Sequence, residues 1–119
     1  MSKTEKSPLI FVIHILENIE DIELFIKNAK KEDFFADKQK QNAIIHSIEI
    51  IGEATRNLPI EFTSKYPYVE WSKIIGMRNK LSHGYFGVDL EIVWEVVKRN
   101  IPELKQEIIK IKKDLENEK

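Results

Sequence analysis

An arginine and a histidine with complementary chemistry stand five residues apart, at Arg78 and His83. Arginine carries a permanent positive charge and a planar fork of N–H donors that matches phosphate oxygens. Histidine can accept and return a proton near neutral pH. Cleavage of an RNA phosphodiester needs both functions, because a base must take the 2′-hydroxyl proton and a cation must stabilise the charged transition state. The pair therefore indicates a site that could cleave RNA without a metal ion.

The spacing of this pair also allows a purely structural interpretation. Five residues of helix turn through about 140°, so Arg78 and His83 would not share one face of a regular helix. Gly84 is expected to end the helix and leave His83 on its last turn, where two copies related by a dimer twofold could line one cleft. Alternatively, Lys80 and His83 form only a helix C-terminus, since cationic side chains suit the negative end of the helix dipole.

The charge distribution singles out the same segment. The formal net charge is −1, so the whole chain gives no electrostatic argument for nucleic acid. Residues 71–85, however, carry Lys73, Arg78 and Lys80 and no acidic residue. Lys73 and Lys80 are therefore candidate RNA-binding residues, although a solvated helix face would explain the same charges.

No metal or cofactor site is predicted. The chain has no cysteine, which excludes thiolate ligands and cysteine nucleophiles. His46, Glu49 and Glu53 stand at i, i+3 and i+7 of one predicted helix, where they could supply two ligands of a carboxylate-bridged metal site. No second such set accompanies them. The more ordinary interpretation is that these side chains bond locally or adjoin an active site.

Three aromatic residues precede the charged segment, at Tyr66, Tyr68 and Trp71. Such side chains could stack on the bases of a single-stranded nucleic acid. They could equally anchor a loop to a hydrophobic core, which is the commoner use of aromatic residues. The sequence leaves both uses open.

The elements that must position these residues are helices. Apolar residues recur at three- and four-residue spacings, strict alternation is absent, and no hairpin dipeptide occurs. Helices are expected at about residues 8–30, 37–57, 70–84 and 89–119, with a loop and one helical turn at 59–70. Ser7 and Asp89 are good N-caps, and the last helix is expected to kink at Pro102. The predicted fold is all-α, an up-and-down bundle of four to five helices in one domain, residues 1–119.

Nothing in the sequence predicts export or membrane insertion. The first apolar run covers only residues 9–16, and acidic residues follow it where a signal peptide would need small ones. No run approaches the roughly 20 apolar residues of a membrane span. We therefore expect a cytoplasmic protein that makes no contact with a membrane.

One long stretch resembles a known family. The segment from Trp71 to Asp89 is similar to the motif region of HEPN-domain proteins of the HepT-like branch, which share an Arg, four residues, His, one residue, Tyr pattern. Arg78, His83 and Tyr85 match all three fixed positions. The resemblance extends over about residues 9–105. Its further segments are Glu49–Ala54 with Leu58–Pro59, Leu90–Trp94 and Ile101–Leu104.

This resemblance implies a HEPN-like helical homodimer or higher oligomer that acts as a metal-independent endoribonuclease. Such proteins are the toxins of toxin–antitoxin pairs, and the antitoxin is a minimal nucleotidyltransferase. Carried over by position, Arg78 would stabilise phosphate, His83 would be the general base or acid, and Asn79 would orient the site. Tyr85 would be the residue to which the antitoxin attaches adenylate.

Two other functions fit the same residues. A non-catalytic HEPN module could use the motif to bind nucleotide or to scaffold the partner transferase, because binding and cleaving a phosphate need the same side chains. A plain structural dimer is the third possibility. The sequence alone indicates neither which RNA is cut nor whether Tyr85 is modified.

Overall fold

The structure, a computed structural model, describes residues 7–81 and 87–117, and it opens with the long helix α1 (Pro8–Ile26). Proline suits the first position of a helix because its φ is fixed near the helical value and it lacks an N–H that would have no partner there. Ser7 occupies the predicted N-cap, but its side chain makes no capping hydrogen bond. The predicted position of the N-cap is therefore confirmed, but the side-chain hydrogen bond that a serine N-cap usually accepts is absent at Ser7.

The short helix α2 (Lys31–Ala36) and the long helix α3 (Lys38–Arg56) meet at Asp37. The Asp37 carboxylate accepts a hydrogen bond from the Lys40 N–H at 3.0 Å, and this bond caps α3. α3 contacts α1, α2, α5 and α6, so it is the central helix of the bundle.

The next elements are shorter than the sequence predicted. α4 (Ile60–Thr63) is the one helical turn expected within residues 59–70. The helix expected at 70–84 is instead two pieces, α5 (Trp71–Ile75) and α6 (Met77–Leu81), separated at Gly76. The prediction of one continuous helix is therefore wrong. Its expected end at His83 and Gly84 lies outside the described residues.

The last helical segment contains an irregular turn. Asp89 caps α7 (Leu90–Glu95), because its carboxylate accepts from two backbone N–H groups of the first turn. The π-helical turn η2 (Val96–Asn100) follows, and α8 (Ile101–Asn117) completes the segment. Pro102 has no N–H, and its ring crowds the carbonyl four residues earlier, so a wider turn accommodates it. The irregularity thus falls close to the predicted position, as a π-helical turn.

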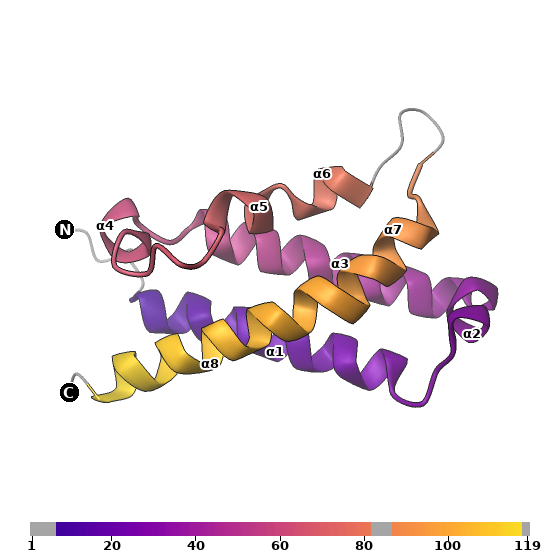
Figure 1. The fold of residues 1–119 in the computed structure, drawn as a ribbon, viewed down its shortest axis with the longest axis horizontal. Helices are drawn as coiled ribbons and strands as arrows, with labels where there is room; N and C mark the ends of the chain where they lie inside the picture. Colours follow the sequence, from indigo (N-terminus) through magenta and orange to yellow (C-terminus); the bar gives the residue numbers. More distant parts are fainter. Residues whose placement is uncertain (1–6, 82–86, 118–119) are drawn as a thin grey trace.

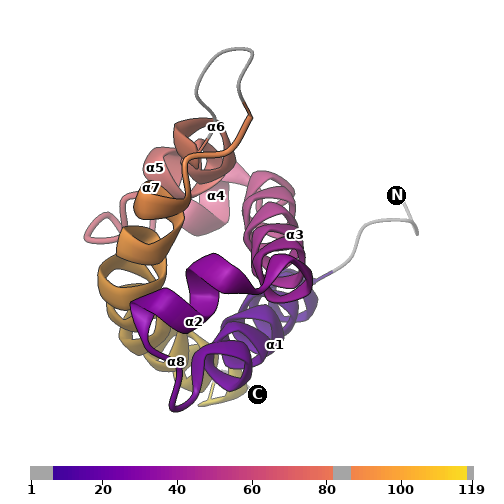
Figure 2. The same ribbon diagram turned by 90° about the vertical axis from the view of Figure 1, so that its right-hand side faces the viewer.

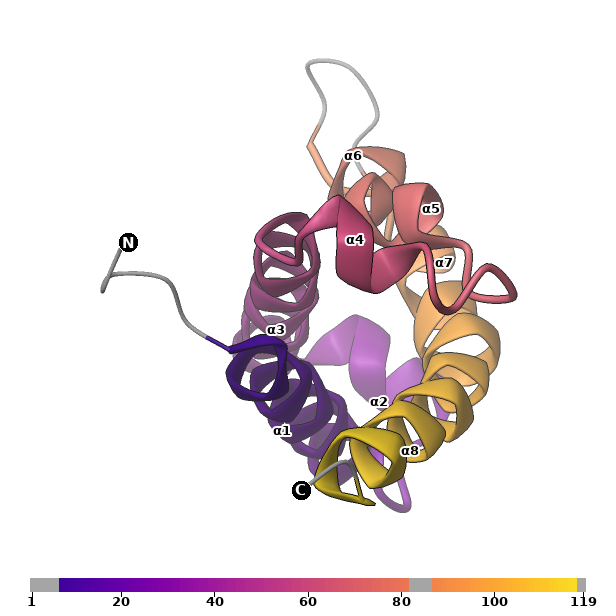
Figure 3. The same cartoon turned by 90° about the vertical axis from the view of Figure 1, so that its left-hand side faces the viewer.

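The helices form an up-and-down bundle with four walls, seen end-on in Figures 2 and 3. α1, α3, the row α5–α6 and the run α7–α8 make the walls in chain order, and each runs opposite to the one before it (Figure 1). α2 lies at one end of the bundle and α4 at the other. This arrangement confirms the predicted all-α bundle.

Isoleucine dominates the core of the bundle. Each of the three long helices contributes residues that are 0–1% exposed: Ile15, Ile19 and Ile22 from α1, Ile44, Ile48 and Ile51 from α3, and Ile101, Ile108 and Ile111 from α8. Burying one such side chain contributes about 1.5–3 kcal/mol. α5 and α6 bury fewer residues, Ile74, Met77 and Leu81, so their position depends on what they touch in the longer helices.

Candidate active site

At Gly52 of α3, the backbone of α5 lies within van der Waals reach of an added Cβ atom. A Cβ atom placed on Gly52 would lie 3.4 Å from the carbonyl oxygen of Ile75 and 3.5 Å from that of Ile74. Only glycine leaves that space empty. α5 ends at this contact, and Gly76 begins the break after which α6 sets off. The crossing of α3 and α5 therefore fixes where α6 starts, and α6 carries the candidate residues Arg78 and Asn79.

Arg78 is tied to the central helix by one ion pair. Its Nε–H donates to Oε2 of Glu49 at 2.7 Å. The Arg78 side chain is 54% exposed and that of Glu49 is 37% exposed, so the pair lies at the surface with one face open to solvent. Glu49, considered above as a metal ligand, is thus a partner of the motif arginine.

A cavity of about 280 Å³ opens beside this pair, between α3 and the α5–α6 row. It is lined by Glu49, Gly52, Glu53, Arg56, Ile75, Arg78 and Asn79. Two arginines and an asparagine amide supply donors for phosphate oxygens, and the two carboxylates can accept hydrogen bonds from ring or amino N–H groups of a base. The cavity can therefore take a polar, partly anionic group such as a nucleotide.

Lys73 and Lys80, the predicted RNA-binding lysines, line a different cavity. This larger space of about 560 Å³ lies between α5–α6 and the η2–α8 segment. Lys73 also pairs with Glu70 at 3.2 Å. Two residues of helix turn through about 200°, so Lys80 and Arg78 leave α6 on opposite sides. The structure therefore does not bring the two lysines together with Arg78 in one cavity.

The far wall of the larger cavity is acidic. Burial, followed by repulsion from Glu103 and Glu70, raises the pKa of Glu107. Burial, with Asp114 and Glu107, raises the pKa of Tyr68, whose side chain lines the same cavity. Both shifts indicate a region that disfavours additional negative charge. A phosphate would meet repulsion in this cavity from the α8 side.

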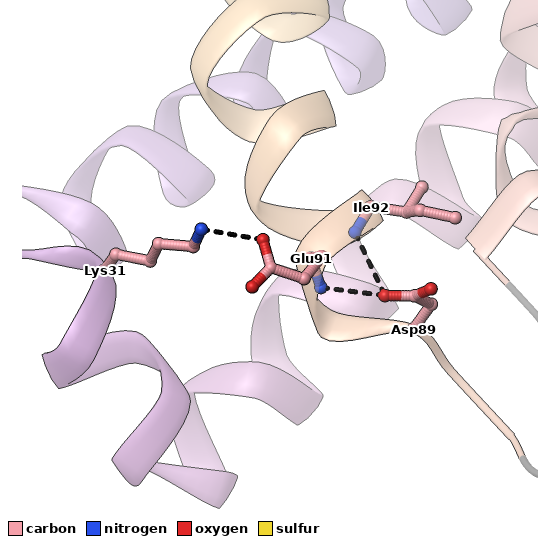
Figure 4. Close-up of polar contacts among 4 residues, drawn as sticks. All are labelled: Lys31, Asp89, Glu91 and Ile92. Carbon is pink, nitrogen blue, oxygen red and sulfur yellow. Dashed lines mark hydrogen bonds and ion pairs between the residues drawn. The ribbon is translucent and has the colours of Figure 1, made fainter.

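The two ends of the motif segment are held together, although His83 and Tyr85 themselves lie outside the described residues. The Asp89 N–H donates to the Leu81 carbonyl at 2.7 Å, and Leu81 is fully buried. Figure 4 shows the Asp89 carboxylate oriented toward the N–H groups at the start of α7, and Glu91 pairing with Lys31 of α2 at 2.7 Å. A backbone hydrogen bond therefore holds together Leu81 and Asp89, the residues on either side of 82–88 in the sequence.

The remaining candidates take ordinary structural places. His14 and His46 are exposed, and the described part of the chain holds no group of three or more histidine, aspartate or glutamate side chains that could bind a metal ion. Tyr66 is buried, and the Trp71 indole N–H donates to the carbonyls of Thr63 and Tyr66, both at 3.1 Å. These two aromatics anchor the α4–α5 connection to the core, as one of the two interpretations of the sequence expected.

The sequence allowed Glu49 to adjoin an active site, but it did not identify Arg78 as the partner of Glu49. Glu49 and Arg78 are 29 residues apart, and only the packing of α3 against α5–α6 brings them together. A signal was nevertheless present. Glu49 and Gly52 stand three residues apart on α3, so a carboxylate and a gap for a close helix crossing share one face.

A bundle of this topology, with its motif arginine held at the α3 crossing, defines a HEPN-like helical domain. A family profile described as "Ribonuclease HepT-like" matches residues 15–111. This protein belongs to the HepT-like ribonuclease family.

Several curated proteins are similar to this chain. A "probable ribonuclease HepT" of Thermococcus cleftensis is 46% identical over 99 residues, which cover 83% of this chain and 90% of that protein. A "putative RNase" of Methanocaldococcus jannaschii is 43% identical over 114 residues, 96% of this chain and 94% of that protein. A "gamma-glutamylcyclotransferase and putative RNase" of the same organism is 50% identical over 114 residues. This chain spans only 51% of that last relative.

No solved structure gives a significant match. Within the described residues, no helix combines the length and the apolar character needed to cross a membrane.

Proposed function

We propose that this protein is a metal-independent endoribonuclease, the toxin of a toxin–antitoxin pair, and that it acts as a homodimer or higher oligomer. The observation that carries the proposal is the position of Arg78. This motif arginine of a ribonuclease family is anchored by Glu49 and half exposed beside a cavity of about 280 Å³. A guanidinium held in this way suits the phosphate of a single-stranded RNA.

The proposed reaction uses the RNA's own 2′-hydroxyl as nucleophile. His83 takes the proton from the 2′-hydroxyl, the 2′ oxygen forms a bond to phosphorus, and the bond from phosphorus to the 5′ oxygen breaks. The leaving 5′ oxygen receives a proton from an acid, and the products are a 2′,3′-cyclic phosphate and a 5′-hydroxyl. Arg78 stabilises the negative charge on the non-bridging oxygens, and Asn79 orients the substrate.

The partner in this proposal is a nucleotidyltransferase that attaches adenylate to Tyr85. An adenylate on the tyrosine oxygen, two residues beyond His83, would place a phosphate where the substrate phosphate binds. The added negative charge would engage Arg78 and repel incoming RNA. Modification would therefore silence the ribonuclease without unfolding it.

The test is cleavage of total RNA by the purified protein in EDTA. We expect the wild type to cut and to leave 2′,3′-cyclic phosphate ends, and His83→Ala and Arg78→Ala to lose about 10²–10⁴-fold in rate. His14→Ala and Arg99→Ala, which change an exposed histidine and an exposed arginine elsewhere, are the matched controls.

Each outcome of this experiment decides something. Activity that requires an added divalent ion for chemistry would rule out the mechanism. A protein that binds RNA through Arg78 and does not cut it would instead be the non-catalytic HEPN module. Loss of the folded state in both motif variants, seen by circular dichroism, would support the capping interpretation of the motif.

A further inference from the structure

The contact between Arg78 and Glu49 engages only one edge of the guanidinium. The bond runs from Nε of Arg78 to Oε2 of Glu49 at 2.7 Å. No other hydrogen bond or ion pair of Arg78 occurs among residues 7–81 and 87–117. The carboxylate thus holds the Nε side, and the outer edge formed by the two terminal nitrogens keeps its donors for another acceptor.

The outer edge is the part of arginine that binds a phosphate through two parallel hydrogen bonds. A lysine could not do both tasks, because its single ammonium group has no second, fixed edge. The cavity beside the pair has room for the acceptor, and Asn79 and Arg56 lie on its wall. The geometry therefore suits an arginine whose Nε side is held by a carboxylate and whose terminal nitrogens bind a phosphate.

Arg78 needs such an orienting contact because α6 is short. The helix has five residues and starts directly after the break at Gly76, whereas α3 has 19 residues and is central to the bundle. A long side chain on a short, surface helix samples many rotamers, and ordering them costs free energy at the moment of binding. The hydrogen bond to Glu49, which stands on the long helix α3, restricts the rotamers of the Arg78 side chain. As an ion pair at the surface, it contributes little to stability itself.

We propose that Glu49 is a positioning residue that orients Arg78 toward an RNA phosphate in the cavity between α3 and α6. This inference rests on the proposed function for the identity of the substrate. An alternative hypothesis predicts the opposite effect on RNA binding: Glu49 would neutralise the charge of Arg78 and so weaken its contact with RNA. Removing a neutralising carboxylate strengthens binding of RNA, whereas removing a positioning residue weakens it and slows cleavage.

The experiment compares Glu49→Gln and Glu49→Asp with a matched control, Glu23→Gln. Glu23 also joins two helices, through Lys105 at 2.8 Å, and its side chain is 41% exposed against 37% for Glu49. Two readouts are needed: kcat and KM for cleavage of a single-stranded RNA, and the Kd of the same RNA with 2′-O-methyl groups that prevent cleavage.

We expect Glu49→Gln to lower kcat by roughly 10- to 100-fold, the cost of misplacing a catalytic group by about 1 Å. KM should change by a much smaller factor than kcat, and the Kd of the 2′-O-methyl RNA should rise. Glu49→Asp keeps a carboxylate on a shorter stem and should recover part of the loss. Glu23→Gln should behave as the wild type in both assays.

The opposite results would overturn the inference. Tighter RNA binding or faster cleavage by Glu49→Gln would show that Glu49 neutralises the charge of Arg78. Unchanged values of kcat, KM and Kd would show that Arg78 needs no orienting contact. If Glu49→Gln unfolds, the Glu49→Asp variant decides in the same assays. If the wild type binds RNA without cutting it, the ribonuclease proposal fails, while weaker binding by Glu49→Gln would still support the positioning role.

Discussion

Replacing Gly52 with valine perturbs the crossing that sets the position of Arg78. The Cβ atom would lie 3.4 Å and 3.5 Å from the carbonyl oxygens of Ile75 and Ile74. Each γ carbon extends about 1.5 Å further. Valine carries two of them and has few χ1 rotamers in a helix, so we expect at least one to press on the α5 backbone. Because these atoms belong to the backbone, α5 itself has to move.

The expected magnitude follows from two opposing terms. Overpacking of this kind costs about 1–3 kcal/mol, and valine gains back only a few tenths of a kcal/mol over glycine in helix propensity. Gly52→Val should therefore lower the thermal midpoint by several degrees. Gly52→Ala should be neutral or slightly stabilising, because its Cβ makes contacts at the near limit of the ordinary van der Waals range and alanine gains up to about 1 kcal/mol in helix propensity.

The effect on activity should exceed the effect on stability. A shift of α5 by about 1 Å would carry Arg78 with it and cost on the order of 10²-fold in rate. Cleavage is measured well below the thermal midpoint of each variant, so that the folded fraction is the same. Ala43→Val, which adds similar bulk to α3 about 13 Å along the helix from Gly52, is the control.

Two results would refute this reasoning. A Gly52→Val protein with the stability and activity of the wild type would mean that α5 is free to adjust at the crossing. A variant that is less stable but fully active below its midpoint would mean that the crossing does not position Arg78.

Two further predictions concern the segment after α6. Asp89→Ala removes the carboxylate that caps α7 and should cost about 1 kcal/mol by thermal denaturation; an unchanged midpoint would show that the cap is not needed. Tyr85→Phe should keep the fold and most of the ribonuclease activity but escape silencing when the partner transferase and ATP are present. Mass spectrometry of the co-expressed wild type should place adenylate on the peptide containing Tyr85, and adenylate on another residue would contradict the assignment.

Local signals predicted the long helices well. The cap at Asp89 was predicted because an N-cap depends on a few neighbouring residues, and the second helix was expected from about Asp37, which caps α3 in the structure. The break at Gly76 was not predicted, since its position depends on the contact of α5 with Gly52, a residue more than 20 positions earlier.

The sequence predicted the residues of the candidate site only in part, because their grouping also depends on contacts between helices. Lys73 and Lys80 were grouped with Arg78 by their net charge along the chain, whereas the helix turns them toward a different cavity. The pairing of Arg78 with Glu49 depends on how α6 is set against α3. A sequence specifies each helix face but not which residue of one helix meets which residue of another.

The two cavities beside α5–α6 differ in charge, and the larger one is the less suitable for a phosphate. The larger cavity combines Lys73 and Lys80 with Glu70, Glu103 and Glu107, and burial and neighbouring carboxylates already raise the pKa of Glu107 there. A phosphate entering it would add to a surplus of negative charge.

The smaller cavity balances two arginines against two carboxylates. One of those carboxylates holds the inner edge of Arg78, so the outer edge remains available to an anion. The orientation of the Arg78 guanidinium, more than the net charge of the lining, therefore makes the smaller cavity the more suitable one for a phosphate. The same argument supports the proposed role of Glu49: without this carboxylate, Arg78 would keep its charge, but nothing would fix the orientation of its guanidinium.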